Sequence, residues 1–216
     1  MKKLLVSMFL GVALLFVCSS AQANDFDFSG TFAKDNDIVA LGFTVGEDST
    51  ITIFSSSWLY ANPPAGGSLG GFDPILAIWD SAGGYVSEQD DGHNVGSTLS
   101  KGVLYDHGSW DSYYDVFLSA GNYTATIAQY SNFRDGTNLS EGFRYDGNDN
   151  FTFDMGYGGA TQPYFNGIWD SNDPRTANWE FHILNVAEAH HDVPEPATML
   201  LLGFGLLGLG LARKKS

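Results

Sequence analysis

Residues 74–79 read PILAIW, and this segment carries apolar side chains at odd and even positions alike. A strand that is apolar on both faces has to be covered on both sides, as a central strand of a packed sheet is. Its proline stands first, where a strand tolerates the missing backbone donor. The segment therefore predicts a buried central strand, around which the rest of the fold is arranged.

Four further segments alternate apolar and polar residues, which is the period of a half-buried strand. They are TITIF at 50–54, NYTATIA at 122–128, FTFDM at 151–155 and WEFHI at 179–183. Turn-forming residues stand between such runs, at 46–48, 81–84, 119–122 and 146–149. We find no convincing helical spacing between residues 24 and 185. The pattern predicts an all-β fold of two packed sheets, a β-sandwich, over residues 24–187.

The first 23 residues have the three parts of a secretory signal peptide. Lys2 and Lys3 precede an apolar run at 4–17, and Ala21 and Ala23 form the A-x-A pattern that signal peptidase cleaves. The single cysteine lies inside this segment, so cleavage after Ala23 leaves an exported domain without cysteine. We therefore expect no disulfide, and stability has to come from packing or from a bound metal.

The charge of the exported region excludes one class of partner. Between residues 24 and 192 the chain has 24 acidic and only 5 basic residues. Phosphate binding needs clustered Lys and Arg, so we expect neither nucleic-acid nor anionic-lipid binding. Cations are the expected counter-partners, although acidic side chains also serve solubility alone.

The end of the chain reads as a sorting signal at residues 194–216, after a linker at 188–193. It consists of Pro194, Glu195 and Pro196, an apolar segment at 197–212 long enough for a marginal membrane-spanning helix, and the basic residues Arg213, Lys214 and Lys215. By the positive-inside rule the basic residues stay at the cytoplasmic face. A plain membrane anchor is the alternative.

This three-part tail resembles the PEP-CTERM sorting signal of exported bacterial proteins. The resemblance implies processing by an exosortase in a Gram-negative bacterium, with transient anchoring in the membrane through the apolar helix. It also implies a final place at the cell surface or in an extracellular polysaccharide matrix of the kind that biofilms contain.

The front of the exported region, residues 26–130, resembles the bacterial pre-peptidase C-terminal (PPC) domain. Four features of the family occur here in the same order. They are an acidic pair at Asp35 and Asp37, an "fD-x-x-L-x-l-D-x-x-G" segment at 72–83, a "dDg" turn at 90–92 and an "aG-x-Y" strand at 120–123. The chain departs from the family after residue 130, where further strands are expected up to residue 187. The resemblance implies a jelly-roll-like β-sandwich.

Four aspartates are candidate metal ligands: Asp73 and Asp80 at the ends of the central strand, and Asp90 and Asp91 in the acidic turn. Calcium takes six to eight oxygen ligands, commonly carboxylates and loop carbonyls. Some relatives with this domain bind calcium, so the resemblance favours the same ion here. The alternative is that these carboxylates accept hydrogen bonds from nearby backbone groups.

Other chemistries have weaker support. GGSLG at 66–70 has the G-x-S-x-G pattern with Ser68 at its centre, but a nucleophile elbow needs a strand-to-helix turn in an α/β sheet. Exposed aromatic rings would stack on sugars, and the candidates are Trp58, Tyr60, Trp110, Tyr113, Tyr114, Tyr164 and Trp169. We expect a non-catalytic structural or adhesive protein associated with exopolysaccharide; the alternatives are a calcium- or carbohydrate-binding module and a hydrolase.

Overall fold

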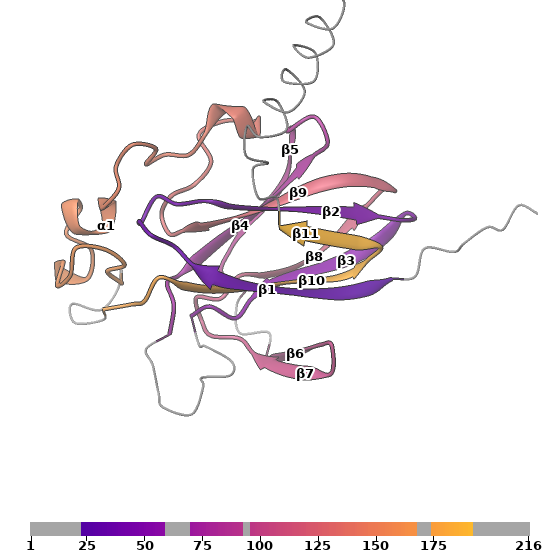
Figure 1. Cartoon of the computed structure of the whole chain (residues 1–216), viewed down its shortest axis with the longest axis horizontal. Helices are drawn as coiled ribbons and strands as arrows, with labels where there is room; N and C mark the ends of the chain where they lie inside the picture. The colour runs from indigo at the N-terminus through magenta and orange to yellow at the C-terminus, as the bar shows by residue number, and fades with distance from the viewer. Residues whose placement is uncertain (1–22, 59–69, 93–95, 168–173, 192–216) are drawn as a thin grey trace, which may run out of the picture.

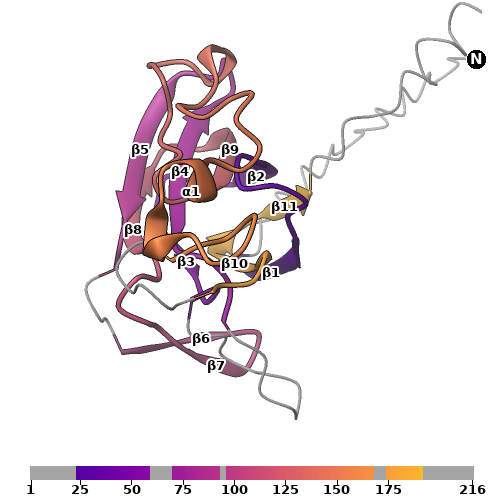
Figure 2. The ribbon, with the colours of Figure 1, turned by 90° about the vertical axis from the view of Figure 1, so that its left-hand side faces the viewer.

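The computed structural model describes residues 23–58, 70–92, 96–167 and 174–191, and these form two antiparallel sheets packed as layers (Figures 1 and 2). One sheet has the order β1 (Asn24–Thr31), β10 (Asn178–Val186), β3 (Ser49–Ser55) and β8 (Tyr113–Leu118). The other has the order β11 (Glu188–His191), β2 (Val39–Val45), β9 (Gly121–Gln129), β4 (Pro74–Asp80) and β5 (Tyr85–Asp90). The described residues are thus an all-β sandwich, as the alternation predicts.

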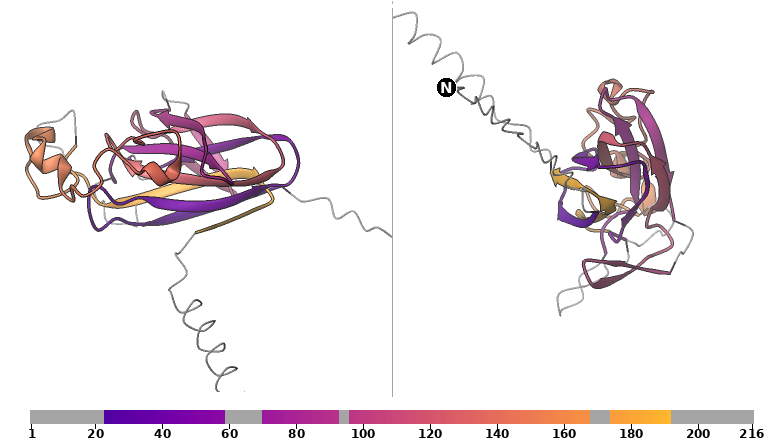
Figure 3. Two further views of the ribbon diagram at one scale, coloured as in Figure 1. Left: turned by 90° about the horizontal axis from the view of Figure 1, so that it is seen from above. Right: turned by 90° about the vertical axis from the view of Figure 1, so that its right-hand side faces the viewer.

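A hairpin and three short helices surround the sandwich. The hairpin of β6 (Ser97–Ser100) and β7 (Val103–Asp106) stands apart from the two layers, beside the four-stranded sheet (Figure 1). Between β9 and β10 lie η1 (Leu139–Glu141), α1 (Phe151–Asp154) and η2 (Tyr157–Gly159). Seen from above, α1 projects beyond one end of the layers (Figure 3).

Strand β4 is the buried central strand that PILAIW predicts. Leu76 and Ile78 belong to the core between the sheets, which also contains Ile51 and Ile53 of β3. The opposite face of β4 packs into a second cluster that includes Trp79 and residues of the segment 130–143. Both faces are therefore apolar because both are covered.

The outer face of the four-stranded sheet carries a row of paired residues, Asp27, His182 and Phe54. The hairpin β6–β7 lies against this row. Its Tyr105 ring is 4.1 Å from the His182 ring, and Ser100 donates a hydrogen bond to Asp27. The hairpin is thereby fixed to the sheet although it shares no backbone ladder with either layer.

Residues 151–155, which alternation predicts as a strand, instead form helix α1 and its end. Phe151 is buried and stacks on Tyr145 with ring centroids 4.2 Å apart, and Met155 N donates to Phe151 O. The prediction was wrong because a strand needs a neighbouring strand, whereas here Thr152 N donates to the side chain of Asp35.

The last described residues differ from the expected linker at 188–193. Glu188–His191 form strand β11, which pairs with β2 so that Glu188 lies opposite Thr44. A four-residue strand that completes a sheet edge has too short a pattern to recognise in sequence.

Several sequence predictions fall on residues that the structure does not describe. These are most of the signal peptide at 1–23, Ser68, the sorting signal at 194–216 and its apolar segment at 197–212. Within the described ranges, no helix is both long and apolar enough to cross a membrane.

Candidate cation site

Three of the four predicted aspartates meet at one end of β4. Asp73 directly precedes that strand, and its position is fixed by Phe72, whose ring stacks on Phe32 at 4.8 Å. Asp90 is the last residue of β5, and the β4–β5 register places it opposite Ile75. The antiparallel pairing thus brings together the beginning of one strand and the end of the next.

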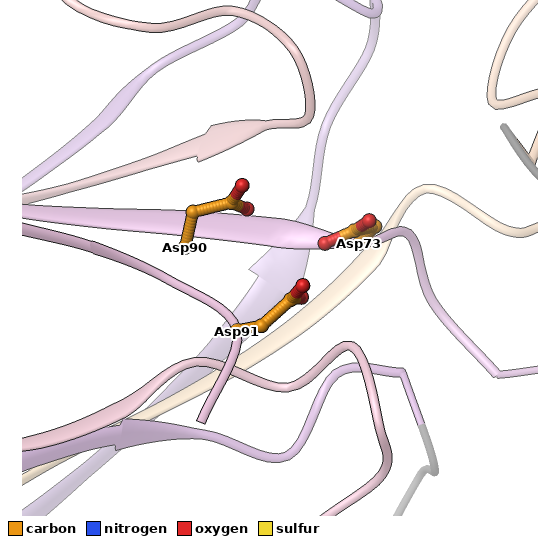
Figure 4. A group of neighbouring side chains, drawn as sticks. All are labelled: Asp73, Asp90 and Asp91. Atoms are coloured by element: carbon orange, nitrogen blue, oxygen red, sulfur yellow. The ribbon is translucent and has the colours of Figure 1, made fainter. Parts of the chain in front are cut away.

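The three carboxylates turn toward one another (Figure 4). One carboxylate oxygen from each of Asp73, Asp90 and Asp91 lies within 4.8 Å of the others. Two ligands on opposite sides of a calcium ion are separated by about 5 Å, twice the usual calcium–oxygen distance. One ion could therefore contact all three side chains.

A tight turn holds Asp91 in place. Asp91 has φ 64°, and Gly92 N donates to Asp111 O at 2.7 Å. A Cβ atom on Gly92 would lie 2.9 Å from that same carbonyl oxygen, so the close approach requires glycine. The acidic turn is thus locked against the loop that contains Asp111.

The cluster is electrostatically unfavourable without a cation. Burial, together with the nearby negative charges of Asp90, Asp91 and Asp111, raises the pKa of Asp73 to about 9. Burial and the charges of Asp91 and Glu88 raise the pKa of Asp90 to about 7. Like charges in a poorly hydrated place disfavour their own ionisation, and a divalent cation reverses that effect.

In two of the carboxylates, one oxygen also lacks a hydrogen-bond partner. Asp73 is 7 % exposed, and Oδ1 of Asp73 and Oδ1 of Asp90 have no hydrogen-bond partner. No salt bridge among the described residues involves Asp73 or Asp90. Buried carboxylate oxygens are normally hydrogen-bonded or bound to metal, so the residues fit a hard cation with oxygen ligands.

The structure separates Asp80 from this cluster. Asp80 ends β4, seven residues after Asp73, which corresponds to roughly 20 Å of strand. Its Oδ1 accepts hydrogen bonds from Ala82 N and Gly84 N, both at 2.8 Å. Asp80 thus closes the β4–β5 turn, which is the backbone-capping role that the sequence left open as an alternative.

A Ser-His-Asp arrangement occurs elsewhere, on the outer face of the four-stranded sheet. Ser56 Oγ lies 2.9 Å from His182 Nε2, and His182 Nδ1 lies 2.8 Å from Asp27 Oδ1. Both Ser56 and His182 are fully buried, and the imidazole contacts the rings of Phe54 and Tyr105. A substrate carbonyl cannot reach Ser56 in this arrangement, which therefore acts as a structural hydrogen-bond network. Because Ser56 and His182 are 126 residues apart, no local sequence pattern indicates it.

The candidate sugar-stacking aromatics pack within the protein. Trp58 lies under the Arg175 guanidinium at 3.5 Å and touches Trp110 edge-on, and the Tyr114 hydroxyl is buried. Each member of the set that the structure describes is at most half-exposed. Tyr60 and Trp169 lie outside the described residues.

A protein-family model matches the C-terminal end of the chain. Residues 192–215 match the model of the PEP-CTERM protein-sorting motif. This motif indicates an exported, surface-associated protein that an exosortase sorts. No curated protein matches the chain. The resemblance of residues 26–130 to the PPC domain stays a prediction.

Proposed function

We propose that this protein is a non-catalytic exported domain that binds calcium at Asp73, Asp90 and Asp91 and serves as a structural or adhesive component of an extracellular polysaccharide matrix. The observation that carries the proposal is the buried carboxylate of Asp73, which lies beside two further carboxylates and whose Oδ1 atom has no hydrogen-bond partner. The sorting motif supports the location, because it belongs to exported, surface-associated proteins.

The ligand chemistry favours calcium over softer metals. All three candidate ligands are carboxylates, whereas zinc and copper sites draw on imidazole or thiolate. Loop carbonyls and water complete the six to eight oxygens that calcium takes, and magnesium demands a smaller, octahedral site. Extracellular calcium modules bind at about 0.1–1 mM, an affinity that a cluster of three carboxylates can supply.

Binding would stiffen one end of the sandwich. The ion would join the start of β4 to the end of β5, and Asp73 O already accepts a hydrogen bond from Tyr130 N at 2.8 Å. The described pairing brings β5, β4 and β9 together at this point. Bound calcium would offset the repulsion among the three aspartates and make this end of the domain rigid, which suits a load-bearing matrix component.

Calorimetric titration of the purified protein with calcium chloride tests the proposal, with thermal melting in parallel. We expect saturable binding and a higher melting temperature for the native protein. The variant Asp90→Asn/Asp91→Asn should lose both effects. The charge-matched control Glu47→Gln/Glu188→Gln, at two exposed positions, should keep both. Equal calcium responses in all three proteins would show that the acidity acts only as a diffuse counter-ion layer.

A further inference from the structure

A second place on the sandwich has the shape of a ligand site. The segment 130–143 covers the β4 side of the outer face of the five-stranded sheet. Further along this sheet, toward β11, a depression of about 400 Å³ remains. This volume is in the range of small-molecule sites. The lining residues are Gly42, Phe43, Thr44, Ser81, Asn122, Tyr123, Thr124 and His190.

The strand register explains why the sheet is hollow here. Thr124 of β9 lies opposite Gly42 of β2, and Gly42 lies opposite His190 of β11, so the three form one row across the sheet. Paired residues share a face, and Gly42 contributes no side chain between its two neighbours. Thr44 and Asn122 form the next row on the same face. The depression therefore has a low floor at Gly42 and polar side chains on both sides of it.

The lining selects for an uncharged, polar ligand. Hydroxyl and amide groups reach solvent from Thr44, Ser81, Asn122 and Thr124, and Thr44 Oγ1 donates to Asn122 Oδ1 at 2.9 Å. No residue of the lining is Asp, Glu, Lys or Arg. An apolar ligand would leave these hydroxyl and amide groups without hydrogen-bond partners. That cost in binding free energy lets such a site discriminate against apolar ligands.

Charge around the rim excludes an anionic ligand. Glu188 lies opposite Thr44 and therefore on the same face, so an acidic residue borders the uncharged lining. A uronate or phosphate group would be repelled by Glu188 and would meet no Lys or Arg in the lining. A ligand with many hydroxyl groups and no charge would pair with the polar lining and would avoid the repulsion.

We propose that this depression binds a neutral saccharide, such as a short segment of an uncharged polysaccharide. The inference deepens the proposed matrix role, on which it rests for the source of the saccharide. Its chemistry does not depend on calcium, because Ser81 follows the end of β4 whereas Asp73 precedes its start, roughly 20 Å away.

The test is calorimetric titration of the purified protein with neutral hexasaccharides of glucose, galactose and mannose, up to about 1 mM, with an alginate oligomer as the anionic comparison. We expect at least one neutral hexasaccharide to bind and alginate not to bind. Asn122→Ala/Thr124→Val should weaken that binding at least tenfold while the melting temperature stays near that of the native protein. Thr50→Val, a matched change at an exposed threonine of β3, should leave it unchanged.

The outcomes separate this inference from the calcium proposal. Asp90→Asn/Asp91→Asn should bind the saccharide as the native protein does, even where its calcium response is lost. Absence of binding by all three hexasaccharides would overturn the inference. Undiminished binding by a folded Asn122→Ala/Thr124→Val variant, or equal binding of alginate, would overturn it as well.

Discussion

The Nδ1 atom of His182 lies 2.8 Å from Oδ1 of Asp27, and this contact joins two paired strands that are 155 residues apart in sequence. Asp27 also accepts a hydrogen bond from Ser100 of the hairpin β6–β7. One carboxylate thus connects the first strand, the tenth strand and the hairpin. The network resembles a hydrolase triad in its contacts and differs from one in being closed to substrate.

Removing the Ser56 hydroxyl should cost stability and no activity. Ser56→Ala leaves His182 Nε2 buried without its partner, so we expect a loss of about 1–3 kcal/mol in the free energy of unfolding. Denaturant unfolding measures this loss, with the exposed Ser29→Ala as a neutral control. An ester hydrolysis rate in the native protein that Ser56→Ala abolishes would contradict the structural role.

Acid should weaken the contact between Asp27 and its neighbours. Partial burial alone would raise the pKa of Asp27, but hydrogen bonds from His182 and Ser100 hold it below its ordinary value of 3.8. The stabilisation is therefore present above about pH 4 and is lost as the pH falls through the lowered pKa. We expect Asp27→Asn to flatten the acid limb of a melting profile between about pH 2 and 5. An identical acid limb in native protein and variant would contradict this.

The calcium-free protein should lose stability as the pH rises. The pKa of Asp73 is raised from 3.8 to about 9, so the folded protein holds a proton there that the unfolded chain releases. This contribution is complete below about pH 4 and disappears as the pH passes 9. In the presence of a chelator, the melting temperature should fall from pH 5 to pH 9, and Asp73→Asn should remove most of that decline.

Calcium provides the second arm of the same experiment. A bound cation stabilises the ionised carboxylates, so saturating calcium should reduce the fall of the melting temperature with rising pH in native protein. It should have no such effect on Asp73→Asn. A melting temperature that rises with pH in the chelated native protein would contradict the repulsion among the three aspartates.

Asp35 should matter far more for stability than its neighbour Asp37. Buried Asp35 accepts hydrogen bonds from Thr152 N, Thr152 Oγ1 and Phe165 N, which fix the segment between β9 and β10. Asp35→Ala leaves these donors buried and unpaired, and we expect a loss of about 3 kcal/mol or more. Partly exposed Asp37 accepts hydrogen bonds from the N–H groups of the exposed residues Ala33 and Lys34, which water can satisfy, so Asp37→Ala should cost about 1 kcal/mol or less. Denaturant unfolding of the two variants compares them directly, and equal losses would contradict the difference in burial.

Sequence predicted the parts of the fold that a local period encodes. PILAIW became β4 and TITIF lies within β3, because alternation or continuous apolarity reports which faces are covered. FTFDM had the same alternation and became α1, since no strand lies beside it. Strand β11 was missed because four residues are too few to show a period.

The sequence by itself determined the sorting motif at its end, the all-β class and the presence of acidic residues near the central strand. Each of these features is encoded by residues that are close together in the sequence. Only the tertiary structure decided that Asp73 meets Asp90 and Asp91 while Asp80 turns to its own backbone, because strand register sets which ends of β4 and β5 coincide. The hollow above Gly42 likewise depends on three strands from distant parts of the chain, whose side-by-side order no local pattern specifies.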